Sequence, residues 1–363
     1  MNRRAVLIGS AAALAAGGGV VGTSFARMGS SANYEHALSS LRAPLGDGLK
    51  EIVRYATLAA NNHNVQPWRF HLSERAIRIR PDFSRRTPAV DPDDHHLYVS
   101  LGCATENLVL AAQARGRLGE PHFDSENEGS VVFDLGAGAE TRSTLCDAIP
   151  LRQSTRADYD GRAAPADDLV QIERVARLPG VDMVLITERP MLDRVRDLII
   201  DGNTAQMADR AFMAELKSWM RFNPHAALAT GDGIYSGVSG NPALPDWLGP
   251  RMFDIAFRAK AENERYARQL NSSAGVAVFV AEQADPAHWV QVGRACQRFA
   301  LQATALGLKH AFVNQPAEVA NVRPELATLV GMPGRRPDIV MRFGYGPDLP
   351  MSPRRPVDAV IQR

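Results

Sequence analysis

The sequence contains few of the residues from which several common kinds of site are built. Its 363 residues include three cysteines, Cys103, Cys146 and Cys296, which lie far apart, and there is no Cys-x-x-Cys motif. This pattern excludes a disulfide framework and a thiolate metal cluster, so we expect buried thiols. The net charge of +1 provides no basic field for nucleic acid, and we predict no nucleic-acid partner.

Several catalytic motifs are absent as well. There is no zinc-finger pattern, no P-loop and no Gly-x-Ser-x-Gly, although YSGVSGNP, from Tyr235, superficially resembles the last of these. The run Asp93-Asp94-His95-His96 has no second cluster with which to complete a zinc site, so we interpret it as a solvated loop and predict no metal. The 45% hydrophobic and 22% charged fractions are typical of a globular protein with one large or two ordinary domains.

The first 26 residues differ from the rest. MNRR is basic, AVLIGSAAALAAGGGVV is apolar, and Ser24-Phe25-Ala26 has small residues at the positions that a signal peptidase reads. The pair Arg3-Arg4 directly before the apolar run is typical of a twin-arginine signal. An ordinary Sec signal and an uncleaved anchor are the alternatives. We interpret residues 1–26 as a signal peptide of an exported, periplasmic or cell-envelope protein without stable membrane insertion after cleavage; an unused signal would leave it in the cytoplasm.

The pattern of apolar residues predicts the first elements after this segment. Residues 27–34 are interpreted as a linker, and residues 47–60 as a helix. Strand-like alternation in residues 68–72 and 76–80 predicts a strand pair, and a long apolar helix is predicted for residues 97–116, ending at a glycine.

An internal repeat indicates how the chain is organised. SLGCATENLVLAAQARG, from Ser100, aligns with QVGRACQRFALQATALG, from Gln291, so that Gly102 matches Gly293, and each stretch follows a strand-like segment. We therefore predict an α+β protein made of two related halves, with a single unrepeated α/β domain as the alternative. The predicted domains are residues 35–140 and residues 145–363, the second with an insertion near residues 200–260.

The insertion is rich in aromatic residues. Trp219, Met220, Phe222, Tyr235 and Trp247 form either a lid or part of an ordinary core, and the sequence favours neither.

Amide side chains gather in NNHNVQPWRF, between the predicted helix and the first strand. A turn needs one or two such residues. Three asparagines, a histidine and a glutamine within six positions indicate that a ligand is held there.

Arginines recur in two places. In LRQSTR, Arg152 and Arg156 are one helical turn apart with Ser154 between them, so on a helix they project from one face. Two guanidiniums and a hydroxyl suit a phosphate, with a solvated basic surface as the alternative. The pair Arg354-Arg355 lies between prolines, which favour an extended path and present the pair.

These segments resemble the nitroreductase family. NNHNVQPW resembles its flavin-contact segment, Ser-Ser-x-Asn-x-Gln-Pro-Trp, and LRQSTR resembles its phosphate-binding run. PRRPV is similar to the ending of a subgroup with two halves in one chain, the Acg-type FMN-binding oxidoreductases. The resemblance covers nearly everything after residue 35. It implies a nitroreductase-like fold, with the two halves forming an intramolecular pseudo-dimer, as a monomer or a loose dimer.

The resemblance also implies an FMN site shared between the halves. The implied phosphate contacts come from the second half: Arg152, Gln153, Ser154, Arg156, Arg354 and Arg355. The implied flavin contacts are Asn61, Asn62, Asn64 and Gln66 from the first half, and Asn314 and Gln315 in AFVNQPAEV. The first half has Arg42 but no arginine run, and the second half has no Gln-Pro-Trp, so one FMN per chain is expected.

The resulting functional prediction is an FMN-dependent oxidoreductase that passes electrons from a reduced donor, NAD(P)H among them, to an electron-poor small molecule. The resemblance implies no fixed acid or base, so no catalytic residue is named. The alternative is a protein that binds or sequesters FMN with little or no reductase activity, because reduced nicotinamide cofactors are scarce outside the cytoplasm.

Overall fold

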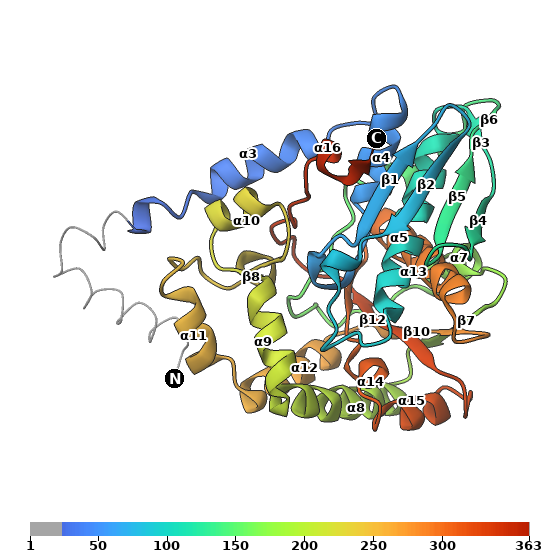
Figure 1. Ribbon diagram of the computed structural model, residues 1–363. Coiled ribbons are helices and arrows are strands. Elements are labelled where there is room, and N and C mark those ends of the chain that lie inside the picture. Colours follow the sequence, from blue (N-terminus) through green and yellow to red (C-terminus); the bar gives the residue numbers. More distant parts are fainter. Residues whose placement is uncertain (1–23, 363) are drawn as a thin grey trace.

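The computed structural model describes residues 24–362, and its elements form two sheets with helices between and around them (Figure 1). The predicted signal segment lies almost entirely outside the described residues. Within those residues, no helix has the length and apolar character needed to cross a membrane.

The first sheet has five strands in the order β13-β1-β2-β5-β4. These are β13 (Ile361–Gln362), β1 (Trp68–Leu72), β2 (Ala76–Pro81), β5 (Ser130–Asp134) and β4 (Pro121–Asp124). Strands β1 and β2 form an antiparallel hairpin with Phe70 opposite Ile79, which confirms the predicted strand pair. The last strand of the chain, β13, runs parallel to β1, so the C-terminus completes a sheet that the first half builds.

The second sheet has four antiparallel strands in the order β11-β12-β10-β7. They are β11 (Lys309–Phe312), β12 (Pro337–Gly344), β10 (Gly275–Ala281) and β7 (Val181–Ile186). Every residue of β10 is buried, as expected for the unbroken apolar run GVAVFVA with helices on both faces of its sheet.

Two long helices, α5 (His95–Gln113) and α13 (Pro286–Ala305), pack against each other between the sheets. Helix α5 contacts the first sheet and α13 the second, so the layers run sheet, helix, helix, sheet (Figure 1). The two glycines matched in the repeat meet where the helices cross, because a Cβ built on Gly102 lies 2.9 Å from the Cα of Gly293. Helix α5 begins two residues before the predicted start, since the Asp91 carboxylate accepts the first free N–H groups of the helix.

The remaining helices cover the outer faces. Near the first sheet and the central pair lie α4 (Leu49–Thr57), α6 (Thr144–Ala148), α7 (Ala166–Ala176) and α16 (Val357–Val360). Over the far face of the second sheet lie α8 (Arg189–Ala208), α12 (Ala259–Asn271), α14 (Gln315–Glu318) and α15 (Arg323–Leu329). Short strands β3 (Arg117–Leu118) and β6 (Gly136–Ala137) pair at the rim.

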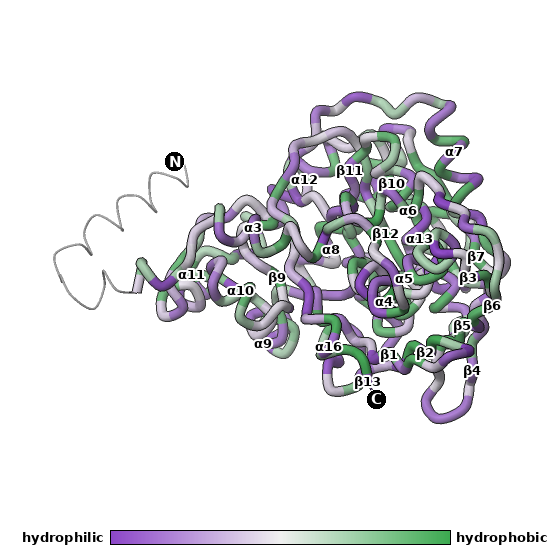
Figure 2. The backbone as a smooth tube through the Cα atoms, turned by 90° about the horizontal axis from the view of Figure 1, so that it is seen from above, coloured by the Kyte–Doolittle hydropathy of each residue, from purple (hydrophilic) through white to green (hydrophobic). Residues whose placement is uncertain are grey.

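A side lobe stands apart from the two sheets (Figure 2). It consists of α3 (Ser31–Leu41) and the insertion: α9 (Arg210–Trp219), β8 (Met220–Arg221), α10 (Pro224–Thr230), β9 (Ile234–Tyr235), the 3₁₀ turn η4 (Ser236–Ser239) and α11 (Gly249–Ala256). Helix α3 begins inside the range predicted as a linker, because the Ser30 hydroxyl accepts the backbone N–H of Asn33 and caps the helix. Tyr34, Leu38 and Tyr235 share a small apolar cluster within the lobe.

Candidate anion-binding site

The segment that carries Arg152, Ser154 and Arg156 is extended, so the two arginines do not share a helix face. Helix α6 ends at Ala148, and the backbone of Thr155 donates to the carbonyl of His310 in β11. The segment therefore bonds to a sheet edge instead of forming a helical turn. The two arginines, the serine and Gln153 all line the same cavity.

The cavity brings together parts of the chain that are far apart in sequence. Seven of the predicted site residues line it: Asn61, Asn64, Arg152, Gln153, Ser154, Arg156 and Arg354. The other lining residues are Arg42, Ala60, Ile234, Val238, Pro350, Met351 and Ser352. Its volume is about 50 Å³. The lining holds four arginines and no aspartate or glutamate, so the cavity is a concentrated positive site.

Among these four arginines, Arg152 has the most buried nitrogen atoms without a hydrogen-bond partner in the described part of the chain. Its side chain is 4% exposed, and Nη2 donates to the carbonyl of Leu58 at 3.1 Å. Its Nε and Nη1 have no hydrogen-bond partner within residues 24–362. Burial lowers the pKa of Arg152 to about 10, which still leaves it charged at neutral pH. A buried charge with free donors is costly unless an anion meets it.

Arg42 enters the same cavity from the opposite half of the chain. Its Nη1 donates to the carbonyl of Pro150 at 2.7 Å, and its buried Nε has no partner among the described residues. Burial, followed by the charge of Arg152, lowers the pKa of Arg42 to about 10. The sequence reasoning noted Arg42 but gave it no role, because no local motif shows that it lies beside a segment more than a hundred residues away.

The two C-terminal arginines face different ways. Arg354 donates to the carbonyls of Thr57, Leu58 and Ala59 at the end of α4, and to Asn64 Oδ1 at 2.9 Å. Its donors are therefore used within the protein, where they satisfy the helix carbonyls and form one wall of the cavity. Arg355 turns away toward Asp82, 3.8 Å from its carboxylate, and does not line the cavity.

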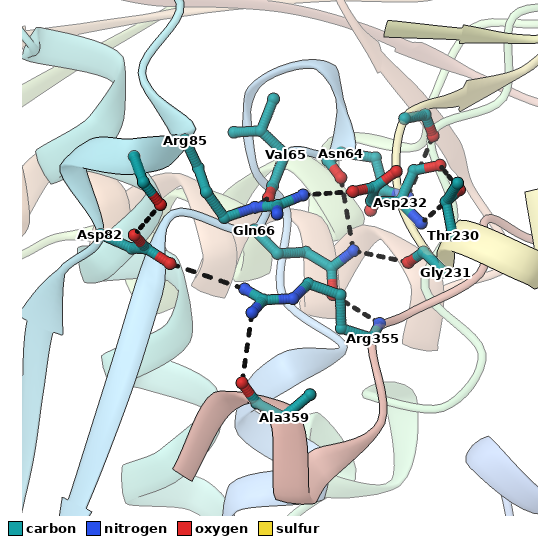
Figure 3. A network of polar contacts seen from close by, with 12 residues as sticks. Asn64, Val65, Gln66, Asp82, Arg85, Thr230, Gly231, Asp232, Arg355 and Ala359 are labelled. Carbon is teal, nitrogen blue, oxygen red and sulfur yellow. Dashed lines mark hydrogen bonds and ion pairs between the residues drawn. The ribbon is translucent and has the colours of Figure 1, made fainter. Parts of the chain in front are cut away.

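The amide-rich stretch binds other parts of the protein (Figure 3). Asn61 Oδ1 accepts the backbone N–H of Gln66, and Asn62 Nδ2 donates to the Thr87 hydroxyl. Asn64 Nδ2 donates to the carbonyls of Gly233 in the insertion and Pro353 in the tail. Of the four predicted amide contacts, Asn61 and Asn64 line the cavity, whereas Asn62 and Gln66 do not.

Gln66 joins the same three parts of the chain. Its amide nitrogen donates to Gly231 at 2.8 Å, and its oxygen accepts the backbone N–H of Arg355 at 2.9 Å (Figure 3). His63, Asn64 and Gln66 have φ angles of 43°, 55° and 54°, in the left-handed region that non-glycine residues rarely adopt. Such backbone persists only where surrounding contacts enforce it, and it is concentrated at functional sites.

Asn314 and Gln315 lie outside the lining of this cavity. Asn314 Oδ1 accepts the backbone N–H of Val340 at 2.9 Å, and Gln315 is buried where α14 approaches Gly202 of α8. Of the aromatic residues left open as lid or core, Tyr235 is buried, and its neighbour Ile234 lines the cavity.

The two histidines of the Asp-Asp-His-His run are buried, so their prediction as a solvated loop is wrong. His95 Nε2 lies 2.8 Å from Asp338, and His96 Nε2 lies 3.2 Å from Glu318. Burial opposes the charged form of His96, but the hydrogen bond to Glu318 and the charges of Asp91 and Glu318 together outweigh it and raise the pKa. The histidines pack inward against carboxylates from distant segments of the chain, and the local sequence gives no sign of these partners. Among the described residues, no His, Cys, Asp or Glu cluster is arranged to hold a metal.

The fold and the cavity define an α+β protein with a buried cationic site. No family model matches the chain. It is 24% identical over 334 residues to "Putative NAD(P)H nitroreductase Rv3131" of Mycobacterium tuberculosis, covering 88% of this chain and 92% of that one. It is 25% identical over 330 residues to "Putative NAD(P)H nitroreductase acg" of the same organism, covering 87% and 95%. Along most of its length, therefore, the chain is similar in sequence to proteins named as putative NAD(P)H nitroreductases.

Solved structures are also similar in part. The FMN-dependent nitroreductase NfnB of Mycobacterium smegmatis, in complex with NADPH, matches with a TM-score of 0.40 and 12% identity, covering 61% of this chain and 97% of that one. A nitroreductase with bound FMN from Desulfitobacterium hafniense matches with a TM-score of 0.38 and 14% identity, covering 61% and 99%.

Proposed function

We propose that the protein is an FMN-dependent oxidoreductase of the nitroreductase type. It takes electrons from a reduced donor of the NAD(P)H class and passes them to an electron-poor small molecule. The observation that carries the proposal is the buried guanidinium of Arg152, with two unpartnered nitrogens, facing a cavity that also receives Arg42 and Arg156 and contains no acid. A phosphate monoester is the ligand that best meets such planar, charged donors.

The size of the cavity limits which part of FMN fits. A water occupies roughly 10–15 Å³ of this kind of volume, so about 50 Å³ takes on the order of four waters. This is enough for a phosphate group but not for a three-ring flavin. For the ring to enter, the cavity must widen, and the apolar residues that line it are Ile234 and Val238 of the side lobe and Met351 of the tail.

Within this proposal, each group of residues has a defined task. Bound FMN supplies the hydride and electron chemistry. Arg152 and Ser154 hold the phosphate by charge-assisted and hydroxyl hydrogen bonds. Asn61 and Asn64 form the wall on the side of the first half, and the side lobe excludes water. No side chain is assigned a proton transfer.

The small cavity favours a second candidate function, which is to bind or sequester FMN with little turnover. Its volume and the apolar residues that the side lobe adds to its lining are the specific observations. Anaerobic titration of the FMN-loaded protein with NADPH, followed by addition of a nitroaromatic acceptor, separates the two. Bleaching and reoxidation of the flavin over many cycles supports the reductase, and a flavin that stays oxidised supports sequestration.

The cofactor proposal is tested by counting FMN and by removing Arg152. We expect isothermal titration to give one FMN per chain. Arg152→Ala is expected to weaken FMN binding by roughly 1.5–3 kcal/mol, the scale of a charge-assisted hydrogen bond, without weakening riboflavin, which lacks the phosphate. Arg142→Ala, at an exposed arginine paired with Asp147, is the matched control. Two FMN per chain, or equal losses for FMN and riboflavin, would overturn the proposed site.

The proposal extends to the location of the protein. The Arg3-Arg4 pair and the apolar run after it support export to the periplasm or cell envelope by the twin-arginine route. Changing the pair to two lysines keeps the charge and removes only the motif. Loss of export of a reporter fused to residues 1–34 is expected, and unchanged export would exclude this route.

A further inference from the structure

Helix α3 packs on α10 of the side lobe and on residues that line the cationic cavity. Two of its residues, Tyr34 and Leu38, are buried, and they pack in the lobe cluster that contains Val238. The Tyr34 hydroxyl donates to the backbone carbonyl of Met351 at 2.7 Å. Both Val238 and Met351 line the cavity. The position of α3 is therefore tied to the state of the cavity.

Arg42, the residue that ends α3, is the most direct link. Its backbone N–H donates to the carbonyl of Leu38, one turn earlier, so its backbone continues the helix. Its guanidinium has five N–H groups, and the described residues accept from Nη1 alone, while the buried Nε has no partner. Arg42 thus brings an incompletely used donor from the N-terminal helix to the cavity that Arg152 occupies from the second half.

The charges there oppose docking of α3 while no anion is bound. Arg42, Arg152, Arg156 and Arg354 line one small cavity without a carboxylate. Like charges held together in a poorly solvated site repel one another. Moving Arg42 away relieves part of this repulsion, whereas an anion in the cavity reverses the sign and attracts Arg42.

The chain just after α3 provides a fixed point about which the helix can move. Arg54 Nη1 donates to the carbonyls of Leu41 at 2.6 Å and Ala43 at 3.0 Å, and Nη2 donates to Pro44 at 2.9 Å. These bonds hold residues 41–44 against α4, and they do not involve Tyr34 or Leu38, through which α3 packs in the lobe. Release of the helix therefore leaves its last residue near the cavity, from which the side chain can re-enter.

We infer that Arg42 is a ligand of the anion and that binding of a phosphate group locks the N-terminal helix α3 over the cavity. In the docked form the anion contacts one more arginine than in the undocked form. Binding of the anion therefore shifts the equilibrium toward docking. The inference rests on the proposed function only in taking the anion to be the phosphate end of a cofactor. It gives the helix that follows residues 1–30 a role as a sensor of cofactor loading.

The test uses the full-length chain and inorganic phosphate as the first probe. Hydrogen–deuterium exchange is measured over residues 31–41 with and without phosphate. Slower exchange with phosphate is expected in the wild-type protein and no slowing in Arg42→Gln. Arg27→Gln, at an exposed arginine before the start of α3, removes the same charge and is expected to behave as wild type. Arg42→Lys keeps the charge and is expected to retain part of the slowing. It is the second variant to measure if Arg42→Gln folds poorly.

Affinity gives a second readout. Arg42→Gln is expected to weaken phosphate and FMN by roughly ten- to 150-fold, the range of one charge-assisted hydrogen bond, and to leave riboflavin unchanged. Slowing of α3 in Arg42→Gln equal to that in wild type would overturn the inference, as would the absence of any phosphate effect in wild type. If phosphate slows exchange in α3 but FMN does not bind, the inference holds and the proposed function fails. If FMN binds equally to wild type and to Arg42→Gln, the proposed function holds and the inference fails.

Discussion

The crossing of α5 and α13 gives the sharpest prediction about the fold, because it depends on two glycines that face each other. In Gly102→Ala, the new Cβ would lie 2.0 Å from the carbonyl oxygen of Val290 and 2.9 Å from the Cα of Gly293. Both are backbone atoms of the opposite helix, so no side chain can rotate away. To restore an ordinary carbon–oxygen contact, the helices must separate by more than about 1 Å, which the packed core on both sides resists.

The magnitude follows from two opposing effects. Overpacking a well-filled core costs about 1–3 kcal/mol, and a backbone clash of this size belongs at the upper end. Replacing glycine by alanine inside a helix returns about 1 kcal/mol. We therefore expect Gly102→Ala to lower the free energy of unfolding by about 2 kcal/mol. Gly293→Ala, whose Cβ would lie 2.0 Å from the carbonyl of Val99, is expected to have an effect of similar size.

Urea unfolding followed by circular dichroism measures both variants. Gln113→Ala, at a half-buried position near the end of α5, is the control and is expected to stay within about 0.5 kcal/mol of wild type. In the double variant one separation of the helices relieves both clashes, so its loss is expected to be smaller than the sum of the single losses. Gly102→Ala as stable as wild type would refute the close crossing and the alignment of the two helices in the repeat.

Two further predictions concern buried charges. Glu106 is fully buried in α5 and pairs with Arg294 at 3.0 Å and Arg298 at 2.7 Å, both in α13. Glu106→Gln is therefore expected to lower the free energy of unfolding by about 3 kcal/mol in the same urea assay. A loss below about 1 kcal/mol would contradict the ion-pair geometry. Burial raises the pKa of the Asp338 carboxyl from 3.8 to about 7 while the pKa of His95 falls, so this buried pair is neutral below that pH. Because the fold favours the protonated acid, its stabilising effect is present below about pH 4 and is lost as pH rises through about 7. The stability of wild type relative to Asp338→Asn should therefore fall between about pH 4 and 7 and level off above that, and a constant difference would exclude the shift.

Local sequence patterns predicted the elements whose partners are close in the chain. The hairpin of β1 and β2 was predictable because alternation and a two-residue turn fix its register without help from elsewhere. Helix α5 was predictable because its long apolar pattern exceeds any strand, and its earlier start follows from Asp91, which caps it through its carboxylate. The addition of β13 to the first sheet was not predictable, since two residues at the end of the chain carry no signal for a partner near Phe70.

The site was predictable in composition but not in geometry. Arg152, Ser154 and Arg156 were identified by their spacing. They do line the same cavity, but they do so from an extended segment and not from a helix. Residues four apart share a face both on an α-helix and on an extended strand, so the sequence alone cannot distinguish the two conformations. Arg42 was missed as a site residue, because its place depends on how α3 packs against the insertion and the tail.

The amide-rich stretch is better understood as a joint, meaning a segment that connects the insertion and the C-terminal tail by hydrogen bonds, than as a surface that contacts a ligand directly. Three left-handed residues within four positions cost about 1–3 kcal/mol each. Asn64 and Gln66 offset this through hydrogen bonds to the insertion and to the tail, each contributing about 0.5–1.5 kcal/mol. The two sums are of similar size, so the conformation is stable only while both partners are docked.

This balance connects the joint to the entry of a flavin ring. The insertion that supplies Gly231 and Gly233 to the joint also supplies Ile234 and Val238 to the cavity. A movement of the insertion large enough to admit a ring therefore removes the hydrogen bonds that hold Asn64 in its strained backbone. If the insertion moves in this way, the amides lose their hydrogen bonds to the insertion in the same step that widens the cavity, and they are then free to bind a ligand.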